Sequence, residues 1–323
     1  MMMERSTLAL WVTKRNDEAH DIISLELVSP DGVPLPAFTA GSHVDLYVGN
    51  GLIRQYSLCN DPAERHRYVL GILKDPSSRG GSCFLHEQVG EGATILVGAP
   101  RCNFPLVETA GKSILIAGGI GITPMLAMAY RLTALGKRFS LHYCGRSIDR
   151  IAFREVLESG PLASSSQFHL DDGDTAQRFS FGDDIGLPEE GSHIYVCGPE
   201  GFINHALQQA YTFGWPDGQL HVEFFRAEAK AVDGDQAITV TAARSGVTVE
   251  VDADRSIASV LMDHGVDIPV ACEQGICGTC VTSIIDGEPL HRDDCLSDAE
   301  KASNKVMTIC CSRAKTKHLV LDI

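Results

Sequence analysis

Three cysteines in the stretch CEQGICGTC most constrain how this chain can fold. Cys272, Cys277 and Cys280 are spaced C-x₄-C-x₂-C, and further thiols follow far downstream. This spacing is typical of a plant-type [2Fe–2S] cluster, which is held by four thiolates. Gly275 and Gly278 allow the backbone to fold back so that its N–H groups face the sulfur atoms. The stretch therefore predicts a cluster-binding loop.

The identity of the fourth ligand stays open at this point. Cys310 and its neighbour Cys311 are the candidates, and Cys295 is a weaker third. If ICCSRA is a strand, its side chains alternate between faces, so only one of the pair can point into the loop. A structural zinc site is the alternative, but such sites usually contain two short C-x₂₋₄-C pairs. The long segment between Cys280 and Cys310 favours the cluster.

The composition indicates a globular protein of two or three domains. The chain has 323 residues, of which 44% are hydrophobic, enough for more than one core. Its 11 scattered cysteines are typical of reduced cytoplasmic thiols rather than of a disulfide scaffold. The N-terminal stretch has no apolar signal region, and no later stretch approaches the roughly 20 apolar residues of a membrane span. We therefore expect a cytoplasmic protein without membrane attachment.

The net charge of −15 argues against nucleic acid as a partner, because an acidic surface repels phosphate backbones. Such a charge serves solubility, and it could also steer the chain toward a basic patch on a protein partner.

The first hundred residues predict a small antiparallel β-barrel. Apolar and polar residues alternate over 23–27, 44–48 and 68–72, and Gly, Pro, Asn or Asp bounds each run. Many short strands with such turns are typical of a closed barrel.

Two polar stretches interrupt this pattern. RQYSLCN (54–60) presents a cation, an aromatic ring and a hydroxyl along one strand, in Arg54, Tyr56 and Ser57. SSRGGSCF (77–84) offers a guanidinium, backbone N–H groups and a hydroxyl, in Arg79, Gly80, Gly81 and Ser82. The second set suits a phosphate monoester. Together they predict a phosphate-containing ligand in the barrel domain.

From residue 111 the pattern changes to alternating strands and helices. SILIA (113–117) reads as a buried strand, GGIGITP (118–124) as a glycine turn and 124–135 as a helix with Pro124 in its first turn and Gly136 at its end. A strand, a glycine loop and a helix N-terminus form a site for a pyrophosphate. Because Pro124 replaces the third glycine of G-x-G-x-x-G, the usual acidic ribose ligand is not expected.

Later elements predict a parallel sheet with ligands at the carboxyl ends of its strands. Cys197 is expected to be a small packing residue rather than a nucleophile, since no hydrolase partner accompanies it. Polar groups gather at these strand ends, namely Arg146, Ser147, Asp171, Asp172, Cys197, Gly198, Pro199 and Glu200.

Seven motifs now carry a family resemblance. RQYSL, SRGGS, GGIGITPML, CGPEGF, HVEFF, CEQGICGTC and ICCSRAK occur in the order seen in the reductase components of Rieske-type oxygenases. The chain resembles the phthalate dioxygenase reductase and vanillate demethylase reductase family over nearly its whole length. The resemblance implies an FMN-binding β-barrel domain (1–107), a ferredoxin–NADP reductase-like α/β domain (108–226), a linker (227–236) and a plant-type α+β ferredoxin domain (237–323).

The resemblance also implies roles for individual residues. Phe225 would cover one flavin face, and Thr123 would lie near the flavin. The FMN would be held by Arg54, Tyr56, Ser57, Leu73, Lys74, Gly80, Gly81 and Ser82, beside Arg79 of the same polar stretch. NADH would lie along Gly119, Gly121, Ile122 and Pro124, with Arg146 and Ser147 near the adenosine and Cys197, Gly198 and Pro199 near the nicotinamide. The cluster would be carried by Cys272, Cys277, Cys280 and Cys310.

The implied function is an NADH-dependent reductase that passes single electrons to a separate Rieske-type oxygenase acting on an aromatic acid or similar substrate. The oxygenase would dock transiently. No general acid or base is expected, since the cofactors carry the chemistry. Arg146 and Arg150 leave NADPH open as the donor. The alternative is a non-catalytic redox sensor or binding module with the same cofactors.

Overall fold

The computed structural model describes residues 7–49, 52–75, 80–225, 235–270, 275, 278–293 and 295–323. The chain divides into two compact units, Met1–Phe225 and Arg226–Ile323. The predicted boundary between residues 107 and 108 stays a prediction, because the barrel and the α/β sheet share one unit.

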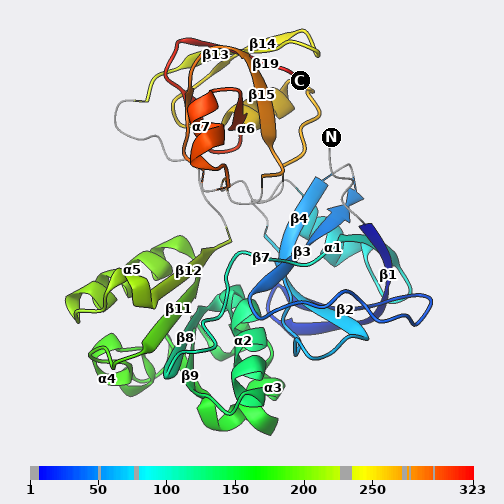
Figure 1. Ribbon diagram of the computed structural model, residues 1–323. Helices are drawn as coiled ribbons and strands as arrows, with labels where there is room; N and C mark the ends of the chain where they lie inside the picture. The colour runs from blue at the N-terminus through cyan, green and yellow to red at the C-terminus, as the bar shows by residue number, and fades with distance from the viewer. Residues whose placement is uncertain are drawn as a thin grey trace. The chain divides into compact units, whose positions relative to one another are not determined.

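The first unit begins with a β-barrel, as predicted (Figure 1). Its strands follow the order β4-β3-β6-β1-β2-β5, with β7 paired to β3. An antiparallel bridge between Leu58, just after β4, and Leu70 of β5 joins the two ends of this order and closes the barrel. The elements are β1 Thr7–Ala19, β2 Ile22–Val28, β3 Ser42–Val48, β4 Leu52–Ser57, β5 Arg67–Leu73, α1 Gly81–Gln88, β6 Thr94–Gly98 and β7 Arg101–Cys102.

The rest of this unit is a parallel five-stranded sheet in the order β10-β9-β8-β11-β12. It confirms the predicted α/β fold. Helix α2 starts two residues before Pro124, and Gly136 ends it with a positive φ of 63°. The strands are β8 Lys112–Gly118, β9 Arg138–Gly145, β10 Ser166–Leu170, β11 Ser192–Gly198 and β12 Leu220–Phe224; the helices are α2 Ile122–Ala134, α3 Arg154–Glu158, α4 Phe181–Asp184 and α5 Glu200–Thr212.

Two cores lie on opposite faces of the parallel sheet, because side chains alternate along its strands. Helices α4 and α5 pack on one face, over Ile114 and Val196. Helix α2 packs on the other, over Leu115 and Tyr195, and this core includes Phe104 and other residues from the barrel side. This shared core packs the barrel against the parallel sheet.

The second unit has the predicted α+β composition. Its sheet follows the order β14-β13-β19-β15-β17, and β16 pairs with β18. Strand β19 lies in the middle of this sheet, parallel to β13 and antiparallel to β15. The elements are β13 Ile238–Ala242, β14 Val247–Val251, α6 Ile257–Asp263, β15 Val281–Asp286, β16 Pro289–Leu290, α7 Asp298–Ser303, β17 Val306–Thr308, β18 Arg313–Ala314 and β19 His318–Leu321.

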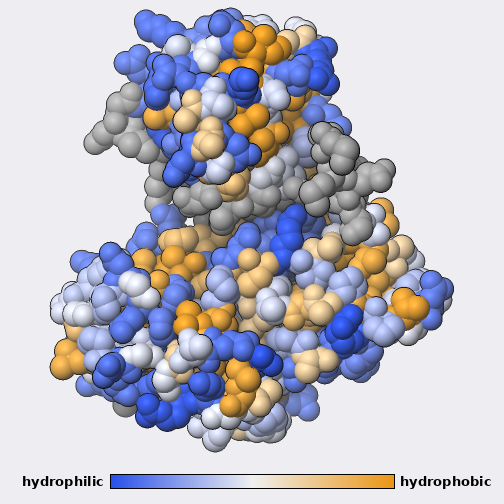
Figure 2. All heavy atoms as spheres, viewed as in Figure 1, coloured by the Kyte–Doolittle hydropathy of each residue, from blue (hydrophilic) through white to orange (hydrophobic). Residues whose placement is uncertain are grey.

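Polar and apolar residues are interspersed over the visible face of the first unit in Figure 2. A helix with the length and hydropathy to span a bilayer is absent from the part of the chain that the structure describes.

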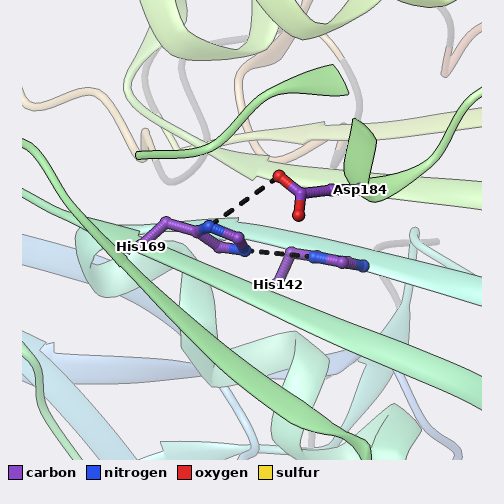
Figure 3. A group of neighbouring side chains, drawn as sticks. All are labelled: His142, His169 and Asp184. Carbon is purple, nitrogen blue, oxygen red and sulfur yellow. Dashed lines mark hydrogen bonds and ion pairs between the residues drawn. The ribbon is translucent and has the colours of Figure 1, made fainter. Parts of the chain in front are cut away.

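Two buried histidines lie side by side beneath α4 (Figure 3). His142 Nδ1 lies 3.1 Å from His169 Nε2, and His142 Nε2 lies 3.1 Å from the Ser140 hydroxyl. Asp184 of α4 lies 3.9 Å from His169 Nδ1. Burial, with His169 as the next cause, lowers the pKa of His142 to about 4. Both rings are therefore neutral at pH 7, and they link β9 to β10 as a hydrogen-bonded pair.

We predict that this pair makes the α/β domain sensitive to acid. Below pH 6.5 the unfolded chain binds protons that the buried ring of His142 rejects, so the free energy of unfolding falls as the pH falls from about 6.5 toward 4, by at most roughly 3 kcal/mol for one group. His142→Gln should flatten this slope. The measurement is denaturant unfolding between pH 7.5 and 5, followed by the fluorescence of buried Trp215.

The exposed His205 on α5 provides a matched control. His205→Gln should keep the wild-type slope, and an unchanged slope in His142→Gln would contradict the assignment.

Candidate functional site

The glycine turn after β8 brings three parts of the first unit together. Gly119 has a positive φ of 53°, a conformation that side chains disfavour. A Cβ on Gly121 would overlap the backbone carbonyl of Cys197 at the end of β11. The turn therefore lies directly against the Cys197–Gly198 strand end, and two of the predicted nucleotide segments form one edge of the sheet.

Thr123 and Pro124 follow this turn within α2, and both are buried. The Thr123 hydroxyl donates to the carbonyl of Ile120 at 3.1 Å. A Cβ on Gly71 of β5 would lie 2.6 Å from the Thr123 methyl group. Thr123 thus contacts the barrel strand that ends at Leu73, which is consistent with its predicted place near a barrel-bound ligand.

Arg146 and Ser147 follow the carboxyl end of β9, the strand beside β8. Arg146 is exposed, and the Ser147 hydroxyl donates to Asp149 at 2.5 Å. The backbone N–H of Asp172 donates to the carbonyl of Arg146 at 3.1 Å, which joins this strand end to that of β10. These polar groups therefore lie on the same sheet edge as the glycine turn.

Glu223 is a site residue that the sequence reasoning missed. It pairs in register with Cys197 on the neighbouring strand, and its Oε2 is buried with no hydrogen-bond partner among the residues that the structure describes. Burial raises the pKa of Glu223 to about 8. The sequence signal for this residue is the one carboxyl among the apolar residues of HVEFF. Burying an acid without a partner costs free energy, so such an acid is often functional.

Cys197 beside it is fully buried, as the packing interpretation predicted. Burial, and next the charge of Glu223, raise the pKa of its thiol. Cys197 is therefore a neutral thiol at the strand end, and Pro199 after it is the N-cap of α5.

The barrel places its predicted residues around the start of α1. Here a helix begins at Gly81, directly after Gly80, whose φ is 94°. A Cβ on Gly81 would lie 2.8 Å from Cγ of Arg54, so the Arg54 side chain crosses the first turn of α1. Tyr56 is half-buried, and desolvation raises its pKa.

The other residues predicted to bind the barrel ligand differ in burial and in hydrogen-bond partners. Ser57 and Ser82 are buried, and the Ser82 hydroxyl accepts a hydrogen bond from the N–H of Asp75 at 3.1 Å. Lys74 pairs with Glu87 of α1 at 2.9 Å, and Leu73 is partly exposed. Arg79 lies outside the described residues.

In the second unit, Cys280 and Cys310 are buried in one core. Cys272 and Cys277 lie outside the described residues. Gly275 has a φ of 74°, and a Cβ there would lie 2.5 Å from the Cys311 sulfur. The loop therefore packs directly on the segment that carries Cys310.

Cys310 and Cys311 lie in a turn between β17 and β18, so the expected strand alternation does not decide between them. A hydrogen bond with Cys310 lowers the pKa of Cys311. The backbone N–H of Cys295 donates to the carbonyl of Gly275 at 3.1 Å. All three candidate thiols are thus near the loop, and Cys310 as the fourth ligand stays a prediction.

These residues fit the implied groups. The buried thiols of Cys280 and Cys310 share one core, and Gly275 of the loop leaves no room for a Cβ against Cys311, which suits a thiolate-bound cluster. In the barrel, a guanidinium lies across the first turn of a helix that starts with glycine, an arrangement suited to a phosphate.

Comparison with known proteins identifies two of the domains. Residues 240–315 match the 2Fe-2S iron-sulfur cluster binding domain and residues 115–208 the oxidoreductase NAD-binding domain. Vanillate O-demethylase oxidoreductase of Pseudomonas sp. strain HR199 is 48% identical over 94% of this chain and 96% of its own length. Phthalate dioxygenase reductase of Burkholderia cepacia is 41% identical over 99% and 98%.

Among solved structures, phthalate dioxygenase reductase, described as a modular structure for electron transfer from pyridine nucleotides to [2Fe–2S], matches with a TM-score of 0.75 and 41% identity over 98% of both chains. The resemblance inferred from the seven motifs is confirmed. The chain belongs to the family of vanillate O-demethylase oxidoreductases and phthalate dioxygenase reductases, and it is an oxidoreductase with an NAD-binding domain and a [2Fe–2S] cluster-binding domain.

Proposed function

We propose that this chain takes hydride from NADH onto a bound FMN and delivers the electrons one at a time, through its [2Fe–2S] cluster, to a separate Rieske-type oxygenase that acts on an aromatic acid or a similar substrate. The observation that carries the proposal is the joining of an NAD-binding domain and a cluster-binding domain in one chain, with full-length relatives named as reductases of oxygenases. When bound, a flavin supplies the conversion between two-electron hydride chemistry and one-electron transfer.

The barrel residues hold and orient this group. Arg54 would neutralise the phosphate, and the backbone N–H groups at Gly80, Gly81 and Ser82 would donate to it at the start of α1. The Tyr56 ring offers a flat apolar surface. Arg79, Ser57, Leu73 and Lys74 complete the proposed set.

The sheet edge orients NADH. The turn from Gly119 to Pro124 accommodates the pyrophosphate, since Gly121 lets the backbone approach closely. Arg146 and Ser147 lie where the adenosine end would be. Cys197, Gly198 and Glu223 would lie beside the nicotinamide, where a neutral thiol and a protonated carboxyl add no charge.

Cys272, Cys277, Cys280 and Cys310 are the proposed cluster ligands, in a domain from residue 237 onward that follows a linker at 227–236. We place the protein in the cytoplasm, because its many thiols suit a reducing compartment, and we expect transient docking of the oxygenase. The acidic net charge is consistent with a basic docking face on that partner.

Anaerobic titration with NADH tests this function. The purified brown protein should lose its visible absorption on addition of NADH, and added cytochrome should then be reduced by single electrons. NADPH should act more slowly, and mass measurement of the extracted flavin should give FMN. Bleaching without onward electron transfer would instead support a redox sensor, and zinc in place of iron would refute the scheme.

Phe225→Ala should strengthen nicotinamide binding. Phe225 follows β12 and is 37% exposed, so its ring is available to stack on the flavin and must move before nicotinamide can. Its removal should tighten NAD⁺ binding by about 0.5–1.5 kcal/mol, up to roughly tenfold, measured by difference absorption. Tyr211→Ala, at an exposed aromatic on α5, should change nothing. Unchanged affinity and hydride-transfer rate in Phe225→Ala would exclude the stacking role.

Glu223→Gln tests the buried carboxyl. As the pH rises through about 8, the carboxyl of the native protein ionises and draws water that nicotinamide must displace, so NADH affinity should fall. The glutamine variant stays neutral and should bind NADH equally well from pH 7 to 9. Stopped-flow flavin reduction at varied NADH gives both affinities, and parallel pH profiles in the two proteins would count against the assignment.

A further inference from the structure

Asp293 is a buried acid in the second unit that the proposed reaction does not use. Its side chain is fully buried, and it lies between the cysteine loop and the segment after Cys310. A Cβ on Gly275, in the loop between Cys272 and Cys277, would lie 2.8 Å from Cβ of Asp293. The acid therefore contacts the cluster loop directly.

The Asp293 carboxylate receives donors from several segments. Oδ2 accepts from the backbone N–H of Leu296 at 3.0 Å, and Oδ1 accepts from the Ser312 hydroxyl at 3.3 Å. The Cys295 thiol lies 3.8 Å from Oδ2. Ser312 is two residues beyond Cys310. The Asp293 side chain therefore contacts both the cysteine loop and the segment that carries Cys310.

Two basic groups face the same carboxylate. His291 Nδ1 lies 3.4 Å from Oδ1, and Lys301 Nζ of α7 lies 3.9 Å from Oδ2. Lys301 also donates to the backbone carbonyl of Asp293 at 2.5 Å. Each of these neighbours offers the carboxylate of Asp293 either a hydrogen-bond donor or a basic nitrogen.

We propose that Asp293 is a positioning residue for the [2Fe–2S] cluster. Its side chain joins the two segments that carry the proposed ligands, and its charge lowers the reduction potential of the cluster. This inference rests on the cluster of the proposed function. A buried negative charge disfavours addition of an electron nearby, because screening is weak in the protein interior. Hydrogen bonds and charge around a cluster are established determinants of its potential.

The test is a redox titration of the full-length holoprotein, in which the reduced cluster is followed by electron paramagnetic resonance. Asp293→Asn removes the charge at constant shape and should raise the midpoint potential. Lys301→Gln removes the opposing charge and should lower it. Asp298→Asn makes the same charge change as Asp293→Asn at an exposed position of α7 and should shift the potential least. Loss of a merely structural contact would not give shifts of opposite sign.

The contacts of Asp293 with the two ligand segments have a second readout, which is the rate at which iron is released to a chelator. This release should be roughly tenfold faster or more in Asp293→Asn, as is typical for loss of an outer-sphere partner, and unchanged in Asp298→Asn.

The outcomes separate the two proposals. A wild-type protein that never binds iron refutes the proposed function. A loaded Asp293→Asn protein whose potential shifts no more than that of Asp298→Asn refutes the role of Asp293. If Asp293→Asn fails to bind the cluster, Lys301→Gln decides: a lower potential supports the inference and an unchanged one overturns it.

Discussion

Close backbone packing at the turn Gly119–Gly121 is the contact on which the first unit depends. Gly121 lies so near the carbonyl of Cys197 that any side chain would overlap it, and Thr123, just beyond, lies against Gly71 of the barrel. These contacts bring the end of β8, the end of β11 and the strand β5 together. The predicted nucleotide and barrel-ligand residues thereby belong to neighbouring parts of one packed body.

The two units treat buried polar groups differently. In the α/β domain, burial keeps His142, Cys197 and Glu223 uncharged. In the second unit, buried Asp293 is surrounded by donors and bases. The uncharged groups of the first unit suit the docking of a flat ring. The buried charge of the second unit suits control of a reduction potential.

Much of the fold followed from local patterns. Period-two alternation identified the barrel strands β2, β3 and β5, and the change to strand, glycine turn and helix identified the parallel sheet. Helix α1 was missed because SSRGGSCF is rich in Gly and Ser, which favour turns. The strand considered for ICCSRA is a turn at Cys310 and Cys311 in the structure, and no local pattern there distinguishes the two. Glu223 and Asp293 were missed since burial of a charged residue depends on tertiary packing that no local pattern records.

The position of β19 has a consequence for biosynthesis. This strand holds the middle of the second sheet, between β13 and β15, yet it is the last of that sheet's strands along the chain, at His318–Leu321. The sheet therefore stays divided until β19 has been synthesised, because β13 and β14 on one side and β15 and β17 on the other are joined through it. The barrel and the parallel sheet precede these strands in the chain and are able to fold earlier, so the second sheet is completed after them during synthesis.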